Sequence, residues 1–244
     1  LIRKNNPRLI IGPLLRETLI KIVPIINYHR IPIISFTNDT TLSKDGIWTL
    51  GYSPYEQIRK IIDYSIKCKR KKVGFISVNN DYGKKIYNLV TAKKNSYQIK
   101  DVLFINPETI KNKEYLNETL SKFLNYNKTK EKKTQVNSKY ELIFIIGDRN
   151  FILEVVPVLT YYDLDLKSTD LFSTSVLNEK TLLNEHSLIN AKFPFVSEKN
   201  INMFDTKWNK IWKNSRSDHL TRLGYYVSKI SIWAASQNAT FESL

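Results

Sequence analysis

The chain has 244 residues, of which 42% are hydrophobic and 25% charged, so the composition excludes a disordered chain and allows one large domain or two small ones. Its longest apolar runs, at residues 9–15 and 142–146, are too short to span a bilayer. The formal charge of +15 comes from lysines scattered over the whole chain instead of one basic stripe, and we therefore expect no nucleic-acid partner.

Short β-branched runs alternate along the chain with longer segments of helical periodicity. The runs predict strands at residues 9–11, 31–36, 47–51, 72–78, 102–105, 142–146, 171–174 and 193–196. The periodic segments predict helices at 14–29, 53–69, from the turn at 80–83 to about 95, 115–126 and 151–162. Two apolar stripes near the C-terminus, from Phe204 to Trp212 and from Leu220 to Ala234, are interpreted as core faces of helices and not as cofactor sites.

Two local features are predicted separately. The densest basic stretch, residues 127–139, has no interleaved aromatic residues for base stacking and is predicted to be a solvated loop. A single cysteine, Cys68, is too few for a disulfide framework or a cysteine metal cluster. Because Cys68 lies on an apolar helical stripe, we expect its side chain to be buried.

The repeated alternation of strands and helices predicts an α/β fold with parallel sheets covered by helices. Such sheets bind ligands beyond the carboxyl ends of their strands, so the loops after the strands are the candidate sites. Three aspartates are expected near those ends, namely Asp81, Asp148 and Asp170. Carboxylates there could act as acid or base, but they also cap the following helix, and capping is the interpretation that we favour.

Catalytic motifs are missing from the sequence. The turn at Gly12 and Pro13 lacks the glycines and the Lys-Ser/Thr pair of a phosphate loop, and no Gly-x-Ser-x-Gly elbow occurs. The three histidines are far apart in sequence, and none has the spacing of metal ligands. Since no nucleophile–base pair is recognisable either, we expect a protein that is not an enzyme and has no cofactor and no metal site.

Three segments of the first half carry a family resemblance. They are residues 10–14 (IIGPL) with 31–38 (IPIISFTN), residues 51–57 (GYSPYEQ), and residues 72–76 (KVGFI) followed by 80–84 (NDYGK). Together they resemble the leucine-binding-protein family, in which the second segment crosses between lobes and the third is a strand followed by D-x-Y-G. The resemblance implies the type I periplasmic-binding-protein fold, with two Rossmann-like lobes joined by a hinge.

Three further segments resemble one branch of that superfamily. Residues 155–162 (VVPVLTYY) resemble a helix of that branch with the motif P-x-L-x-Y/F-Y, and residues 171–175 (LFSTS) resemble its following strand, which ends in Thr-Ser. Residues 219–226 (HLTRLGYY) resemble a later helix of the branch with the motif R-L-x-x-L-G-Y-D. The branch is that of the penicillin-binding-protein activators, outer-membrane lipoproteins that stimulate peptidoglycan synthases. The resemblance implies a location in the bacterial envelope, in the periplasm or facing it, with membrane attachment only through a lipid anchor outside this chain.

The chain departs from the amino-acid receptors at two positions. Those receptors hold the ligand carboxylate with a small hydroxyl residue where this chain has Arg16, and the ammonium with an acid where it has Val176. A buried ammonium without a carboxylate costs several kcal/mol, so no standard α-amino-acid pocket is expected. Arg16, at a helix start, could instead bind an anionic group, or it is an ordinary surface arginine.

The resemblance also predicts the division of the chain. Residues 1–52 are expected to form part of lobe one, residues 53–197 lobe two, and residues 198–244 a return to lobe one. The family's fold places about two βα units ahead of the Gly12 strand. Only residues 1–8 precede it here, so lobe one is expected to be incomplete at its N-terminus.

The expected function is non-enzymatic binding, with two readings kept open. One is a regulator of cell-wall synthesis that binds a peptidoglycan synthase or a small envelope ligand; the other is a solute receptor that works with an ABC permease and takes an amino acid, amide or peptide-like ligand. A small polar or anionic ligand is expected between the lobes, at residues that follow predicted strands: Arg16, Thr18, Thr37, Asp39, Tyr82, Asp148 and Asn150.

Overall fold

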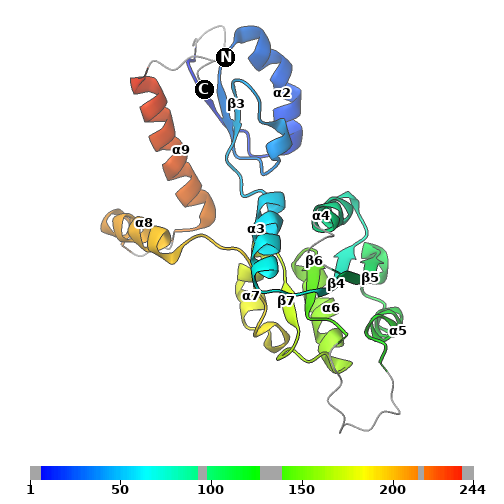
Figure 1. The fold of residues 1–244 in the computed structure, drawn as a ribbon. Coiled ribbons are helices and arrows are strands. Elements are labelled where there is room, and N and C mark those ends of the chain that lie inside the picture. Colours follow the sequence, from blue (N-terminus) through cyan, green and yellow to red (C-terminus); the bar gives the residue numbers. More distant parts are fainter. Residues whose placement is uncertain (1–6, 93–97, 127–138, 214–216, 238–244) are drawn as a thin grey trace. The chain divides into compact units, whose positions relative to one another are not determined.

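The computed structural model describes residues 7–92, 98–126, 139–213 and 217–237, which form two compact units (Figure 1). Unit 1 is built from two segments, Leu1–Ser53 and Val196–Leu244, and unit 2 is the continuous stretch Pro54–Phe195. None of the helices in these described ranges is long and apolar enough to cross a membrane.

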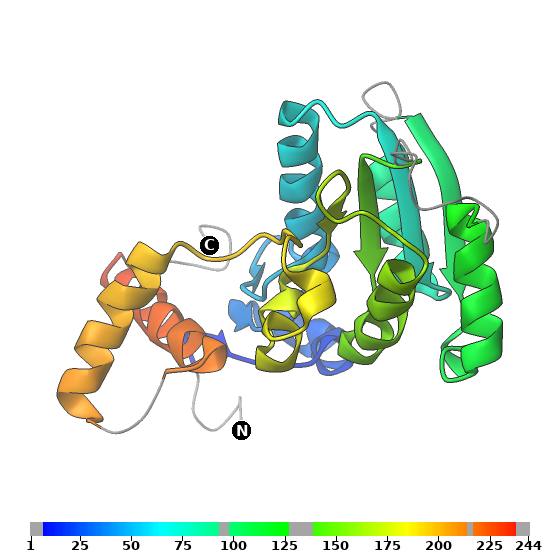
Figure 2. The same ribbon diagram turned by 90° about the horizontal axis from the view of Figure 1, so that it is seen from below.

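Unit 2 is a parallel four-stranded sheet with the strand order β5-β4-β6-β7 and helices on both faces (Figure 2). Its strands are β4 (Lys72–Val78), β5 (Gln98–Ile105), β6 (Leu142–Ile146) and β7 (Asp170–Phe172). Its longer helices are α3 (Pro54–Lys67), α4 (Asp81–Thr91), α5 (Lys113–Leu124) and α6 (Arg149–Tyr161). Short helical segments complete it: η2 (Pro107–Thr109), η3 (Ser175–Asn178), α7 (Lys180–Leu183) and η4 (His186–Leu188).

Two hydrophobic clusters, one on each face of this sheet, hold unit 2 together. Val73 and Phe75 of β4 point to the face that α3 and α4 cover, and Ile76 points to the face that α5 and α6 cover. All five residues of β6 are buried, as expected for a central parallel strand covered on both sides. Burial on both faces explains why β4 and β6 appear in the sequence as nearly continuous apolar runs.

Unit 1 contains a smaller parallel sheet, with the order β1-β2-β3, and three longer helices. Its elements are β1 (Ile10–Ile11), α2 (Arg16–His29), β2 (Ile33–Ser35), η1 (Thr40–Leu42), β3 (Ile47–Thr49), α8 (Glu198–Ile211) and α9 (His219–Ser236). Leu19 and Ile26 of α2 pack against Ile33 and Ile47 of the sheet. The alternation predicted from the sequence is therefore present in both units as an α/β fold with parallel sheets.

Two local predictions are wrong. Residues 193–196 form no strand: only Lys192 makes a single bridge to Phe172, and Pro194 has no N–H to continue the pairing. Cys68 is exposed, because α3 ends at Lys67 and the chain then turns away from the apolar face of that helix. The predicted basic loop lies almost entirely outside the described residues; of it, only Lys139 is described, and it pairs with Asp101.

Candidate functional site

Tyr82 is the first of the predicted residues at the carboxyl edge of the unit 2 sheet, and it lies in the first turn of α4. The side chain of Asn80 caps this helix by accepting a hydrogen bond from the N–H of Gly83 (2.9 Å). A Cβ at Gly83 would lie 2.2 Å from the carbonyl oxygen of Val78 and 2.3 Å from Oγ of Ser77. The glycine thus lets α4 start directly against the end of β4, which fixes Tyr82 at the sheet edge.

The Tyr82 hydroxyl lies within electrostatic reach of the side chain of Thr174, which follows β7 at the same edge of the sheet. Burial raises the pKa of Tyr82 to about 12, so its phenol stays protonated at neutral pH. Next to Thr174, the side chain of Ser173 is buried, and its Oγ has no hydrogen-bond partner among the described residues. The backbone N–H of Ser175 donates to Oε1 of Gln57 in α3 (2.7 Å), so α3 anchors this turn. The sequence marked the loop after β7 but not these side chains.

Asp148 and Asn150 lie after β6. Asp148 caps α6, because its Oδ1 accepts the N–H of Phe151 at 2.8 Å, and the capping interpretation is confirmed for it. Oδ1 of Asn150 accepts a long hydrogen bond from Nη1 of Arg149 (3.4 Å). Both side chains are exposed.

For Asp81 and Asp170, the other two aspartates, the capping interpretation is wrong. Asp81 is the first residue inside α4, which is capped by Asn80 instead. Asp170 opens β7 and therefore lies at the amino end of the strand, where it pairs with Nε of Arg70 (2.8 Å) and with Lys192. Asp170 is thus part of a structural ion-pair cluster away from the carboxyl edge of the sheet.

In unit 1, the structure brings three of the predicted residues together. Nε of Arg16, at the start of α2, is 2.6 Å from Oδ2 of Asp39, which follows β2. Thr37 is buried, and its Oγ1 accepts the N–H of Asp39 (3.3 Å). The other carboxylate oxygen of Asp39 accepts both the N–H and the hydroxyl of Thr41. The fourth predicted residue, Thr18, is exposed on α2.

These bonds determine the ionisation of Asp39. Burial works to raise its pKa, but the hydrogen bonds from Thr41 and Arg16 outweigh burial and hold the pKa below the usual range. The carboxylate therefore stays ionised and occupied by its own neighbours. The convergence of this group with Tyr82, Asp148 and Asn150 on one space between the lobes stays a prediction.

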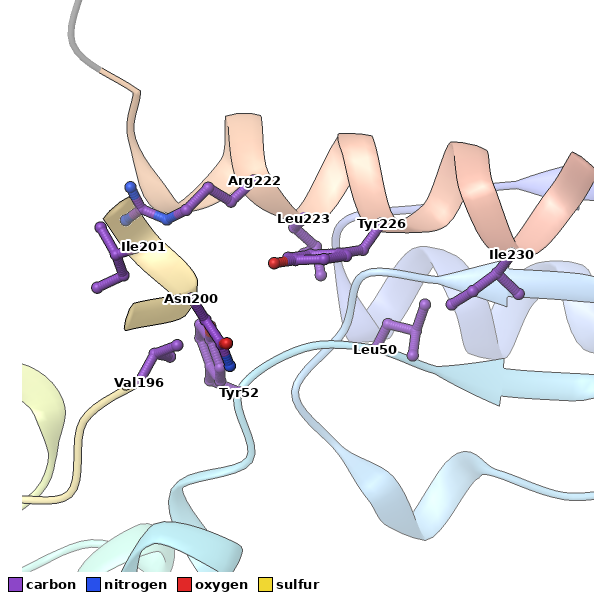
Figure 3. Close-up of a pocket in the computed structure, with 9 residues that line it drawn as sticks. All are labelled: Leu50, Tyr52, Val196, Asn200, Ile201, Arg222, Leu223, Tyr226 and Ile230. Carbon is purple, nitrogen blue, oxygen red and sulfur yellow. The ribbon is translucent and has the colours of Figure 1, made fainter. Parts of the chain in front are cut away.

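A pocket of about 230 Å³ lies elsewhere in unit 1, between α8, α9 and the chain that leaves β3 (Figure 3). None of the predicted cleft residues lines it. Its wall is mostly apolar and is made by Leu50, Tyr52, Val196, Asn200, Ile201, Arg222, Leu223, Tyr226 and Ile230. Sequence reasoning assigned Leu223 and Ile230 to an apolar helix stripe and found no pocket there, because the lining comes from three segments distant in sequence.

The described parts of the chain contain no cluster of side chains that could form a metal site. Within them, no group of three or more His, Cys, Asp or Glu side chains is placed to hold an ion. Val176, at the position where the family resemblance would require an acid, lies in η3 and packs partly buried against the hydrophobic cluster of unit 2.

No protein-family model matches the sequence, and no curated protein matches it either. Solved structures do match. An ABC transporter substrate-binding protein from Desulfitobacterium hafniense in complex with Leu has a TM-score of 0.63 at 12% identity, over 97% of this chain and 66% of its own. The branched-chain amino-acid transporter substrate-binding protein LivJ from Streptococcus pneumoniae, in complex with isoleucine, has a TM-score of 0.61 at 17% identity, over 99% and 68%.

A third similar structure is the C-domain of LpoA from Haemophilus influenzae, a regulator of PBP1A. Its TM-score is 0.55 at 14% identity, over 86% of this chain and 62% of its own. The chain thus spans 62% to 68% of the length of these three structures. The identities are too low to carry function, but the shared architecture is extensive. The chain has the fold of the type I periplasmic binding proteins, which the sequence motifs predicted.

Proposed function

We propose that this chain is a non-enzymatic binding module of the bacterial envelope, and that it acts as a regulator of cell-wall synthesis by binding a partner protein. The observation that carries the proposal is the Arg16–Asp39 pair (2.6 Å). The two charged side chains at the carboxyl edge of the unit 1 sheet thus pair with each other, and Arg16 stands where the amino-acid receptors have a small hydroxyl residue.

An amino-acid ligand needs a carboxylate for its ammonium group, and the predicted site supplies none in a suitable state. Asp39 already accepts hydrogen bonds from Arg16 and Thr41, and Oδ1 of Asp148 is used to cap α6. Val176 stands in the core-facing turn after β7. An ammonium buried beside these groups would have to share or displace their internal hydrogen bonds, and a poorly paired buried charge costs several kcal/mol.

A protein partner could bind to exposed side chains elsewhere on the surface. Its binding would not require the hydrogen bonds and ion pairs of Arg16, Asp39 and Asp148 to break. The similarity to a domain described as a regulator of PBP1A supports a peptidoglycan synthase as that partner. The proposed location is the periplasm or the periplasmic side of the outer membrane. The motifs of residues 155–162, 171–175 and 219–226, which resemble those of the penicillin-binding-protein activators, support the same assignment.

A solute receptor of an ABC importer is the second candidate. It is favoured by the similarity to substrate-binding proteins solved with leucine and with isoleucine. In that case a small polar or anionic ligand would lie between the lobes, held by Arg16, Thr18, Thr37, Asp39, Tyr82, Asp148 and Asn150. Such a ligand would have to replace Arg16 as the partner of Asp39.

Isothermal titration calorimetry of the chain with the common amino acids separates the two candidates. We expect no binding at micromolar concentration, since Arg16 is paired and Val176 offers no charge. Surface plasmon resonance against the purified bifunctional peptidoglycan synthases of the source organism should show saturable binding, and an unrelated envelope protein of similar charge is the control. Micromolar leucine binding, or absence of binding to every synthase, would contradict the regulatory proposal.

A further inference from the structure

The pocket of unit 1 is independent of the proposed cleft and has a chemistry of its own. We propose that it binds a small organic anion with an apolar, ring-sized body, with the acid group at Arg222. The pocket volume is about 230 Å³. An apolar cavity of about 150 Å³ in another protein holds benzene, so this pocket has room for a ring and a carboxylate.

The apolar part of the wall would hold the body of the ligand. Leu223 lies beside Tyr226 in the middle of the pocket, with Leu50 and Ile230 toward one end and Val196 and Ile201 toward the other (Figure 3). Two aromatic rings, Tyr52 and Tyr226, stand between them with hydroxyl groups that can donate to an acid. Apolar walls with a few convergent polar groups are typical of small-molecule sites.

Arg222 is held in place by neighbours that leave much of its guanidinium available. Its Nη1 donates to Oγ of Ser217 (2.8 Å) and to the Ser217 carbonyl (3.3 Å). Nη1 also forms an ion pair with Oδ1 of Asp205 at 3.8 Å, a distance too long for a hydrogen bond, and Oγ of Ser217 links the two groups by donating to that oxygen. Nε and Nη2 have no hydrogen-bond partner among the described residues. The side chain is only 19% exposed and its guanidinium lies beside Ile201, so it is a preorganised cation at that end of a largely apolar lining (Figure 3).

The electrostatics of the neighbours agree with this geometry. Burial raises the pKa of Tyr52, and the charge of Arg222 acts to lower it, which shows that the guanidinium lies within electrostatic reach of that phenol. His219 stacks on the Tyr52 ring with centroids 4.2 Å apart, and burial followed by the charge of Arg222 lowers its pKa. Tyr52 and His219 are therefore neutral at pH 7, and Arg222 supplies the positive charge of the lining.

The position of the pocket in the chain gives its ligand a further role. Leu50 and Tyr52 come just before the boundary at Ser53 and Pro54, where the chain leaves unit 1. Val196 and Ile201 come just after the boundary at which the chain returns. A bound anion would contact both crossing segments at once and fasten them to α9.

The test uses 3-phenylpropionate as the anionic probe and 3-phenylpropan-1-ol as its neutral counterpart, each titrated into the chain by ligand-observed NMR. We expect the acid to bind at least tenfold more tightly than the alcohol, as a charge-assisted hydrogen bond predicts. Arg222→Met should lower the affinity for the acid about tenfold or more. Arg59→Met, on the exposed face of α3 in unit 2, is the matched control and should leave the affinity unchanged.

Hydrogen exchange of the unsubstituted chain locates the probe without relying on a variant that folds. Bound 3-phenylpropionate should slow exchange at residues 50–52, 196–201 and 222–230. The proposal is overturned if neither probe binds at millimolar concentration, or if acid and alcohol bind equally. It is also overturned if protection falls on residues 16–39 and binding is lost in Arg16→Met but retained in Arg222→Met, which would place the probe in the proposed cleft.

Discussion

Gly83 offers a sharp test of how the carboxyl edge of unit 2 is built. In the variant Gly83→Ala, the new methyl carbon would lie 2.2 Å from the carbonyl oxygen of Val78 and 2.3 Å from Oγ of Ser77. Ordinary contacts between such atoms are about 3.5 Å, so α4 or the end of β4 must shift by about 1 Å. The Val78 oxygen is a backbone atom and cannot rotate away. Tyr82, the preceding residue, would move with the helix.

The expected magnitude is the difference between two effects. Overpacking of a tight site costs about 1–3 kcal/mol. Replacing a glycine inside a helix by alanine stabilises it by about 1 kcal/mol. The difference is about 0–2 kcal/mol, and because the overlap is with a backbone oxygen, we expect Gly83→Ala to lie in the upper half of that range, a net loss of about 1–2 kcal/mol. Gly224, inside α9, is the control, because no described atom lies within 4 Å of its added Cβ and only the gain of up to about 1 kcal/mol remains.

Thermal unfolding followed by far-UV circular dichroism measures both variants. A change of 1 kcal/mol moves the Tm by about 2–4 °C for a domain of this size. Gly83→Ala should unfold at a lower temperature than the unsubstituted chain, and Gly224→Ala at an equal or higher one. Tryptophan fluorescence follows unit 1 selectively, because all four tryptophans belong to it: Trp48, Trp208, Trp212 and Trp233. An unchanged or raised Tm for Gly83→Ala would refute the close approach of α4 to β4.

Three other variants or reagents test separate features. Asp170→Asn should lower the free energy of unfolding by about 1–3 kcal/mol in urea titrations, because it leaves Arg70 and Lys192 without their shared carboxylate; a loss below 0.3 kcal/mol would contradict this. Backbone N–H bonds at the start of β4 lower the pKa of Glu141, so its stabilising effect is present above its unfolded-state pKa and is lost as pH falls through the folded one. Glu141→Gln should therefore flatten the fall of stability below about pH 4.5, and an unaltered pH profile would exclude the linkage. Maleimide should label Cys68 fully in the folded chain, and protection until unfolding would contradict its exposure.

The buried strands were the most predictable part of the fold. The runs at 72–78 and 142–146 agree residue for residue with β4 and β6, because strands covered on both faces carry unbroken apolar sequence. The failure at 193–196 has the same basis. Phe193 packs on the core and Phe195 is exposed, which imitates a strand pattern, but Pro194 cannot donate to the ladder.

The candidate site was predictable only to the level of loops. Arg16 and Asp39 follow neighbouring parallel strands, and their meeting follows from that topology. Their direct pairing could not be predicted, because it depends on side-chain orientation at the ends of two short strands. Tyr82 and Thr174 likewise come near each other from the ends of β4 and β7, which are not adjacent in the sheet. Periodicity within one segment carries no information on such contacts.

The pocket at Arg222 could not be predicted from the sequence at all. Leu223 and Ile230 have the spacing of a core-facing helix stripe, and a stripe gives no sign of incomplete packing. Only the placement of Tyr52 and Val196, from segments about 140 residues apart, leaves the space open beside α9. Cavities of this kind come from tertiary geometry and have no motif.

The division of the chain sets an order for its folding during synthesis. Unit 2 is one uninterrupted stretch, whereas unit 1 needs segments from both sides of it. Domains generally fold as units while the ribosome is still translating, from the N-terminus onward. The sheet of unit 2 can therefore form once Phe195 has left the ribosome, before all of α8 and α9 have emerged to join unit 1. Until α9 emerges, Leu50 and Tyr52 at the end of the first segment lack the apolar neighbours that line the pocket with them, and these side chains are open to a chaperone.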